Sequence, residues 1–207
     1  MRKQGFKQAR SEVRRKEILE AALDCFSRLG FEATTIEDIR QKSGASSGSI
    51  YHHYKSKDEL GAAVYLEGLI DYQTGFVAEL EHHTDAKTGL FAIVRYHLGW
   101  VAGHPDWARY LFTMRRAEFM TTRETDIKGQ NKEFLRRVST WFKPYIKDGT
   151  LRELHPELYS ALIFGPCQEF ARHWLAGRMR TGVGEASEQI GRAVWRALRR
   201  TPPRSED

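Results

Sequence analysis

The chain has 207 residues, of which 41% are hydrophobic and 29% charged, and this composition is typical of a protein that folds around a buried core. No apolar run approaches the roughly 20 residues of a membrane-spanning helix, and no apolar stretch follows the basic N-terminus as it would in a signal peptide. The two cysteines, Cys25 and Cys167, form no CxxC pattern, so neither a disulfide framework nor a zinc site is indicated. We therefore expect a cytoplasmic protein without a metal site.

The formal net charge of +6 comes from one end of the chain. Residues 1–16 hold seven Lys and Arg and one Glu, whereas the rest of the chain holds equal numbers of basic and acidic side chains. A basic arm of this kind can contact nucleic-acid phosphates and release the counterions bound to them. The charge alone is equally consistent with a solubilising tail.

Hydrophobic residues recur at helical spacing along the chain, and alternating strand patterns are nearly absent. At the N-terminus the spacing predicts three short helices, at about residues 11–29, 34–43 and 46–54. Gly30 and Gly44 follow the first two helices and suit the left-handed conformation that ends a helix. A tight turn through Gly44 therefore separates the second helix from the third.

Capping patterns mark the starts of these helices. Two overlapping pairs fit the start of the second helix, Thr34 with Glu37 and Thr35 with Asp38. Ser46 is the natural cap of the third helix. The S-x-x-E pattern at residues 56–59 begins a longer connecting helix.

Beyond residue 82 the pattern becomes that of long helices with aromatic-rich faces. Asp85 can cap the first of them, which stops at Pro105, and Pro156 fits the first turn of a later one. Pro144 and Pro166 fall inside predicted helices, where each removes a backbone hydrogen bond and can open space in a bundle. The chain is therefore expected to be all-α.

The third short helix has an outward face suited to contact with a binding partner. Placing its residues at 100° steps puts Ile50 inward with Tyr54 beside it, and leaves Gly48 and His52 on the opposite side. That side is small, polar and aromatic and carries no acid, so it can donate to phosphates or base edges. A helix, a tight turn and a second helix of this kind form a helix-turn-helix, whose second helix enters a major groove.

The run from TTIEDIRQKSG through ASSGSIYHHYKSKDEL resembles the N-terminal domain of the tetracycline-repressor (TetR) family of transcriptional regulators. The resemblance covers about residues 11–62 closely, and the remainder agrees in length and helical character. It implies phosphate contacts by Thr35, Tyr51 and Lys57. The residues expected at the DNA are Thr35, Ser46, Ser47, Gly48, Ser49, Tyr51, His52, His53 and Lys57.

Three positions depart from the family pattern. Arg40 and Ser43 stand where the family commonly has alanine, and Ser47 stands where it commonly has lysine. The stem of Arg40 can pack while its head reaches solvent or phosphate. Base contacts of Ser47 are expected to be weak or mediated by water.

The resemblance also implies an organisation for the whole chain. The chain would comprise a basic flexible arm (1–10), a helix-turn-helix DNA-binding domain (11–56), a C-terminal helical effector-binding and dimerisation domain (57–200) and a disordered tail (201–207). The last two helices, at about 155–200, would form the homodimer as a four-helix bundle.

The aromatic side chains of the C-terminal part suit an apolar pocket with a few polar anchors, which implies an effector that is partly apolar or aromatic. Plain core packing is the alternative for any one of them. His97 is a further candidate anchor. The residues expected to bind the effector are Tyr72, Phe76, Arg95, Tyr96, Trp100, Phe134, Trp141 and Gln168.

Other chemistry finds little support. The chain has no G-x-S-x-G, P-loop or G-x-G-x-x-G motif, so no catalytic residue or cofactor is predicted. A metal site is not indicated either. His52 and His53 diverge by 100° on a helix and cannot easily share an ion, and the pair Glu169 and His173 lacks a second histidine on its face.

We therefore predict a regulator, most simply a repressor, that binds a palindromic operator as a homodimer and is released by a small-molecule effector. The alternatives are a helical small-molecule-binding protein or enzyme without DNA binding, and a helical adaptor for protein partners.

Overall fold

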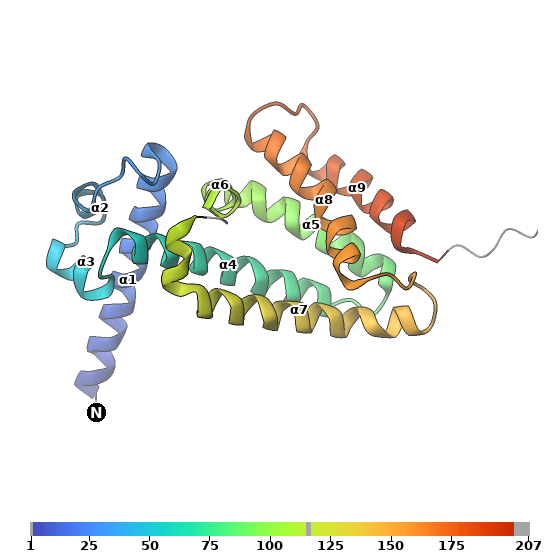
Figure 1. Ribbon diagram of the computed structural model, residues 1–207, viewed down its shortest axis with the longest axis horizontal. Coiled ribbons are helices and arrows are strands. Elements are labelled where there is room, and N and C mark those ends of the chain that lie inside the picture. The colour runs from blue at the N-terminus through green and yellow to red at the C-terminus, as the bar shows by residue number, and fades with distance from the viewer. Residues whose placement is uncertain (1, 115–116, 201–207) are drawn as a thin grey trace, which may run out of the picture. The chain divides into compact units, whose positions relative to one another are not determined.

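The computed structural model describes residues 2–114 and 117–200, with side chains from residue 9 onward. Within these residues the secondary structure is nine α-helices and one short 3₁₀-helix, with no strand beyond an isolated bridge between Leu151 and Arg199 (Figure 1). The predicted all-α fold is confirmed. The tail predicted at 201–207 lies outside the described residues.

The elements follow one another with short connections. Their bounds are α1 Arg2–Leu29, α2 Ile36–Ser43, α3 Ser47–His53, α4 Lys57–Glu81, α5 Ala86–Gly103, α6 Pro105–Met114, η1 Glu118–Arg123, α7 Glu124–Lys147, α8 Pro156–Leu175 and α9 Val183–Leu198. Asp85 caps α5, Pro156 opens α8, and Pro144 and Pro166 lie inside α7 and α8, as predicted. None of the helices in the described part of the chain is long and apolar enough to cross a membrane.

The first helix is longer than the sequence pattern predicts. α1 begins at Arg2, so the backbone of residues 2–10 is helical, whereas the predicted helix starts at about residue 11. Lys, Arg, Gln and Ala are good helix formers, and no proline interrupts the segment, so the helix continues beyond the point where its apolar stripe ends.

The chain divides into two compact units. The N-terminal unit comprises Met1–Ile70 and Asp106–Gly129, and the C-terminal unit comprises Asp71–Pro105 and Gln130–Asp207. The first unit extends beyond the boundary predicted at residue 56 because the first turns of α4 bury Leu60 and neighbouring residues in its core.

Aromatic side chains hold residues 106–129 in the N-terminal unit. The Tyr110 ring stacks on Phe26 with 5.6 Å between centroids, and Phe119 stacks on Phe31 at 4.2 Å. The Tyr110 hydroxyl donates to the Gly61 carbonyl at 3.0 Å. A Cβ on Gly61 would lie 2.5 Å from the Phe31 ring, so the glycine makes room for this packing. α6 and η1 are therefore part of the N-terminal core.

In the C-terminal unit, α5 packs chiefly on α9 and also on α8. Two glycines allow rings to approach a helix backbone: a Cβ on Gly89 would lie 2.3 Å from Trp141, and one on Gly75 would lie 2.2 Å from the Tyr96 hydroxyl. The unit is thus built around large aromatic side chains that fit over small residues.

Candidate DNA-binding and effector sites

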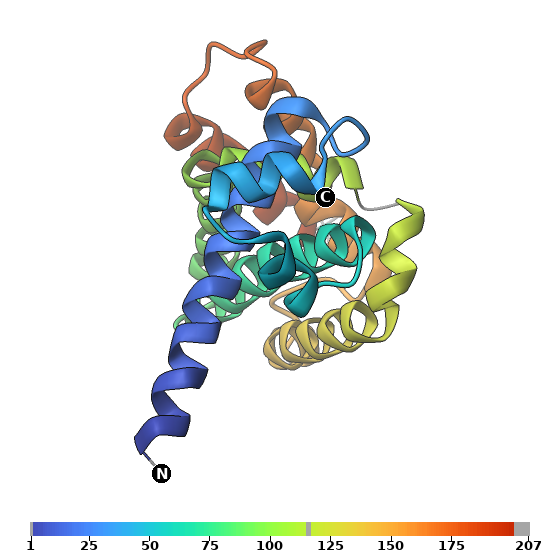
Figure 2. The ribbon, with the colours of Figure 1, turned by 90° about the vertical axis from the view of Figure 1, so that its left-hand side faces the viewer.

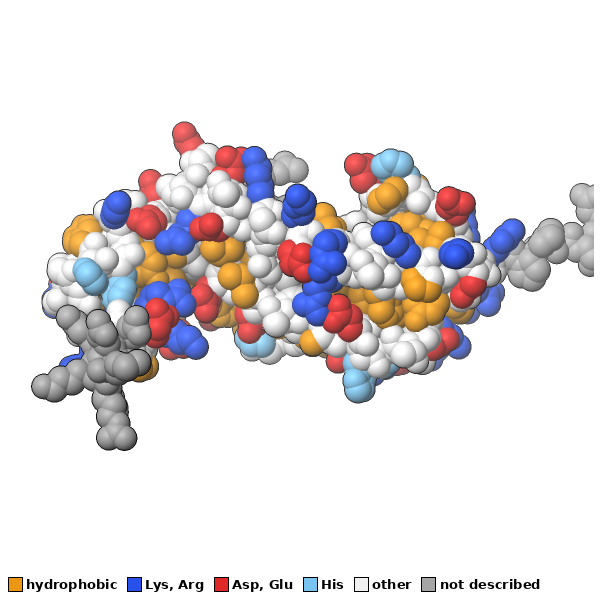
Figure 3. All heavy atoms as spheres, turned by 90° about the horizontal axis from the view of Figure 1, so that it is seen from below, with side chains coloured by type: hydrophobic (Ala, Val, Ile, Leu, Met, Phe, Trp, Pro, Cys, Tyr) orange, Lys and Arg blue, Asp and Glu red, His pale blue; other side chains and the backbone are white. Residues whose placement is uncertain are grey.

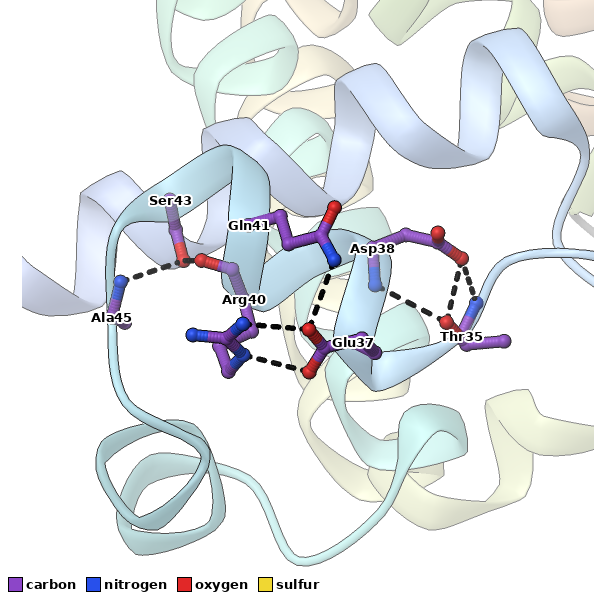
Figure 4. Close-up of polar contacts among 7 residues, drawn as sticks. All are labelled: Thr35, Glu37, Asp38, Arg40, Gln41, Ser43 and Ala45. Atoms are coloured by element: carbon purple, nitrogen blue, oxygen red, sulfur yellow. Dashed lines mark hydrogen bonds and ion pairs between the residues drawn. The ribbon is translucent and has the colours of Figure 1, made fainter.

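α2 begins with a capping box that involves Thr35 and not Thr34. The Asp38 backbone N–H donates to Thr35 Oγ1 at 3.1 Å, and the Thr35 N–H donates to the Asp38 carboxylate at 2.8 Å (Figure 4). The Thr35 hydroxyl also donates to this carboxylate, and these bonds lower the pKa of Asp38. Thr34 is buried, and its hydroxyl donates to the Gly30 carbonyl at 2.7 Å. Of the two predicted capping pairs, the second is confirmed.

The turn between α2 and α3 is held by Gly44, whose φ of +64° is in the left-handed region that favours glycine. Arg40, where the family commonly has alanine, lies on the solvent side of α2. Its guanidinium donates two hydrogen bonds to Glu37, at 2.6 and 2.7 Å, and lowers the pKa of that carboxyl to about 2 (Figure 4). The long side chain is therefore accommodated without entering the core.

α3 has the inward and outward faces that the sequence predicts. The Ser46 hydroxyl caps it by accepting from the Ser49 N–H at 3.1 Å. Ile50 and Tyr54 are buried, whereas the exposed residues are Ser46, Ser47, Gly48, Tyr51 and His52. Figure 2 shows α1, α2 and α3 from the side of these helices.

His53 lies at the edge of this face rather than on it. It is half-buried, and burial is the main reason that its pKa is lowered, with a smaller contribution from His52. The two rings meet edge to face with 5.4 Å between centroids. His52 is thus the histidine that is free to face a groove.

Gly48 has no structural requirement for glycine. Its φ is not positive, and an added Cβ would meet only the Ser46 hydroxyl, at 4.0 Å. Glycine in a helix costs about 1 kcal/mol relative to alanine. A glycine that nothing inside the unit requires points to close approach by something outside it.

Lys57 is engaged inside the N-terminal unit. Its ammonium donates to the carbonyls of Phe31, Glu32 and Thr34, at 3.0, 3.0 and 3.1 Å, and lies 4.8 Å from the centre of the Phe31 ring. All three N–H groups therefore have acceptors in the loop between α1 and α2. This arrangement is at odds with the predicted phosphate contact, because an ammonium has no fourth donor.

The basic residues of α1 are partly neutralised within the same unit. Arg15 pairs with Glu12 at 3.0 Å and with Glu67 at 3.4 Å, and Arg14 pairs with Glu17 at 2.9 Å. Arg10 and Lys16, by contrast, form no ion pair with any described residue. The charge available to a phosphate backbone is therefore smaller than the composition of residues 1–16 suggests.

In the C-terminal unit, eight described rings form one connected group. We call seven of them the aromatic cluster and leave out His104, which stacks on Trp100 at 5.0 Å and contacts no other ring of the group. Centroids of neighbouring rings in the cluster are 5.2 to 6.1 Å apart. Its members are Tyr72, Phe76, Tyr96, His97, Trp100, Phe134 and Phe164. Five of the residues predicted to bind the effector are therefore brought together.

The other three predicted effector residues lie elsewhere. Arg95 is exposed on α5, 3.7 Å from the Glu188 carboxylate, and Gln168 is exposed on α8. Trp141 donates from Nε1 to the His83 carbonyl at 2.8 Å and has no ring contact with the aromatic cluster among the described residues. These three side chains lie apart from the cluster, because spacing within a helix does not fix which face turns inward, and their effector-binding role stays a prediction.

His97 is the polar centre of the aromatic cluster. It is 4% exposed, and its Nδ1 lies 2.7 Å from the Tyr72 hydroxyl. Burial lowers the pKa of His97 to about 4 and raises the pKa of Tyr72 well above its ordinary value, so both are neutral at pH 7. The Nε2 atom is buried and has no hydrogen-bond partner among the described residues. An unpaired polar atom in this position is available to a ligand.

Two polar residues near the cluster were not predicted. Gln73 is buried and donates from Nε2 to Asn131 Oδ1 at 2.9 Å, while Asp71 accepts from Trp100 Nε1 at 2.8 Å. The sequence indicates the burial of Gln73, because this polar residue falls on the apolar stripe of α4 formed by Leu69, Phe76 and Leu80. No group of three potential metal ligands occurs among the described residues.

Comparison with known proteins identifies the family. The model for "Bacterial regulatory proteins, tetR family" matches residues 18–64. The chain is 31% identical over 187 residues to the HTH-type transcriptional repressor KstR2 of Mycobacterium tuberculosis, which covers 86% of this chain and 87% of the relative. The chain belongs to the TetR family. The resemblance predicted from the helix-turn-helix is confirmed, and this TetR-family protein is a DNA-binding transcriptional regulator.

Further relatives agree with this assignment. The HTH-type transcriptional regulator RutR of Escherichia coli K12 is 28% identical over 162 residues, with 77% of this chain and 74% of the relative covered. A TetR family regulator from Marinobacter aquaeolei VT8 superposes with a TM-score of 0.81 at 20% identity, covering 94% of this chain and all of that one. FadR of Bacillus subtilis, solved in complex with stearoyl-CoA, gives 0.75 at 19% identity, covering 86% and 96%. At these identities the solved structures establish the TetR fold alone.

Proposed function

We propose that this TetR-family protein is a repressor that binds a roughly palindromic operator as a homodimer and leaves it when a small effector binds the C-terminal unit. The observation that carries the proposal is the outward face of α3. It is capped by Ser46 and free of acids, and Ser47, Gly48, Tyr51 and His52 are exposed on it. A face of this kind presents donors and small residues to a major groove.

The side chains divide by role on this face. The exposed hydroxyl of Tyr51 donates to a phosphate, which orients the protein, and Ser47, Gly48 and His52 face the base edges. Thr35 is left out because its hydroxyl and its backbone N–H both donate to Asp38. Ser46 and Ser49 border the groove through the cap, and His53 supports α3 from behind. Lys57 is left out because its donors are used in the loop after α1.

The homodimer is proposed to form through α8 and α9. Leu158 is 49% exposed, and several other apolar residues of these helices are only half-buried, among them Leu162, Trp174 and Ile190. Covering them in a two-fold interface would leave the same surface buried on each subunit. Two recognition helices about 34 Å apart would then fit successive major grooves.

The effector is proposed to bind in the aromatic cluster. The Tyr72 hydroxyl has no other polar partner among the described residues, so we assign the phenol as the donor to His97 Nδ1. His97 then carries its proton on Nε2, and that N–H needs an acceptor. A partly apolar molecule with a carbonyl or carboxylate oxygen would supply one. An apolar acyl ligand in a relative of this fold, FadR with stearoyl-CoA, is compatible with such a site. By binding one conformation of the dimer more tightly, the effector would lower its affinity for the operator.

His52→Ala is expected to change the sequence preference of DNA binding. Losing a base-edge contact should weaken binding to the preferred operator about tenfold and leave binding to random duplex unchanged. Fluorescence anisotropy on duplexes from upstream of the protein's own gene measures both. The matched control is His82→Ala, an exposed histidine of the C-terminal unit. An equal loss on operator and random DNA would remove the base-reading role of His52, and no preference for any upstream duplex would remove the proposed function.

Gly48→Ala is expected to stabilise the fold and weaken the DNA complex. The added methyl group has space inside the unit and should raise the free energy of unfolding by up to about 1 kcal/mol. Operator affinity should fall about tenfold, because the methyl group keeps α3 from the base edges. Gly99→Ala, at an exposed helical glycine with equal space, should bring a similar gain in stability and no change in DNA affinity. Unchanged operator binding by Gly48→Ala would contradict close approach at this position.

A further inference from the structure

A groove of about 700 Å³ lies between α5 and α9, within the C-terminal unit. It is separate from the aromatic cluster, with which it shares no residue. The cationic side chains that line it are Lys87, Arg95, Arg192, Arg196 and Arg199. Its size is that of a site for a small organic ligand, since such sites measure roughly 300 to 1,000 Å³.

The charges in this groove are not balanced. Glu188 is its one carboxylate, and it lies 3.7 Å from Arg95 and 3.9 Å from Arg192, longer than a close ion pair. The remaining three cations have no acidic partner among the described residues. Elsewhere, pairs such as Arg136 with Glu133 are 2.7 Å apart, and Figure 3 shows Lys and Arg interspersed with Asp and Glu. Five cations with one carboxylate between them repel one another, and a bound anion would relieve that repulsion.

Aromatic rings accompany the cations. Trp195 and Phe91 both line the groove and are half-buried. Phe91 packs directly on the α9 backbone, because a Cβ on Gly191 would lie 2.9 Å from its ring. On α9, Trp195 shares a face with Arg192 and Arg196, at i, i+3 and i+4, and Arg199 directly follows the end of the helix. Planar apolar surface and guanidinium groups therefore line the same groove.

We propose that this groove binds a phosphorylated ligand with a planar ring, of the nucleotide class. Guanidinium groups match phosphate oxygens in a bidentate manner, and Trp or Phe faces stack on bases. A single phosphate ion would leave most of the groove empty, and duplex DNA keeps its bases paired and unavailable for stacking. The site is distinct from operator binding and from the effector site in the aromatic cluster, and its occupancy does not depend on either.

The test is titration calorimetry of the full-length protein with ATP, AMP, adenosine and pyrophosphate as probes. ATP should bind more tightly than AMP or pyrophosphate, and adenosine more weakly by at least about tenfold, because both the charge and the ring contribute. Raising the salt concentration should weaken ATP binding. The double variant Arg192→Gln/Arg196→Gln should lose at least about tenfold in ATP affinity.

Two further variants separate the contributions. Trp195→Leu should weaken ATP binding and leave pyrophosphate binding unchanged, which also shows that the groove is still folded. Arg172→Gln, on α8 and paired with Glu169 outside the groove, should leave both unchanged.

Absence of saturable ATP binding at millimolar concentration overturns the proposal, as does an equal loss in Arg172→Gln. Equal affinity for ATP and pyrophosphate overturns the ring contact and hence the ligand class. Tighter binding of a single-stranded oligonucleotide than of ATP, lost in the double variant, overturns it in favour of a nucleic-acid site.

Discussion

Lys57→Met is expected to lower the free energy of unfolding by about 2 kcal/mol. The substitution keeps the apolar stem of the side chain and removes the ammonium, which donates to three carbonyls in the loop after α1. Hydrogen bonds to a charged group contribute about 1.5 to 3 kcal/mol each, but water can replace part of them here because Lys57 is only half-buried. The ring contact with Phe31 is lost as well.

Chemical denaturation followed by circular dichroism measures this effect. Lys55→Met is the matched control, because Lys55 is exposed and its side chain makes no ion pair with a described residue. If Lys57→Met proved as stable as the control but lost operator affinity, the predicted phosphate contact would be restored and the loop-holding role of the ammonium would be wrong.

The second large effect concerns the acid stability of the C-terminal unit. Between pH 7 and pH 5 the protein is expected to lose about 2 kcal/mol of stability through His97 alone. The pKa of His97 is about 4 in the folded protein and 6.5 in the unfolded chain, where the imidazole is not buried. As the pH falls, the unfolded chain therefore takes up the proton first. The contribution of His97 to stability is therefore fully present well above pH 6.5. It is lost as the pH falls from 6.5 to about 4, and the loss levels off below the folded pKa. Burial is the cause of the shift, and no charged group of the described residues contributes to it.

His97→Gln removes the titrating group and keeps an acceptor for the Tyr72 hydroxyl. The difference in unfolding free energy between pH 7 and pH 5 should shrink by about 2 kcal/mol in this variant. His82→Gln, which changes an exposed histidine, should retain the pH dependence of the parent. An identical pH dependence in His97→Gln and the parent would show that His97 is hydrated or paired in the folded protein.

Local features of the sequence predicted the N-terminal site well. The caps at Thr35 and Ser46 and the left-handed turn at Gly44 depend on residues within four positions of one another, so spacing alone identifies them. The inward position of Ile50 follows equally from helical periodicity.

Features that depend on distant residues could not be predicted in the same way. The acceptors of Lys57 lie 23 to 26 residues earlier in the chain, and no local pattern joins them to it. Arg95 and Gln168 looked like anchors of an aromatic pocket, but packing between helices turned both outward. Gln73 could have been found as a polar residue on an apolar stripe, although its partner Asn131 could not.

The route of the chain limits how this protein can be taken apart. It passes between the two units after Ile70, after Pro105 and after Gly129, and the stacked rings of Tyr110 and Phe119 return to the N-terminal core from the middle of the sequence. A fragment ending at residue 70 would leave Phe26 and Phe31 without these rings. A chimera that takes its DNA-binding unit from another regulator should therefore replace residues 106–129 together with residues 1–70, because the N-terminal unit is not formed by the N-terminal part of the sequence alone.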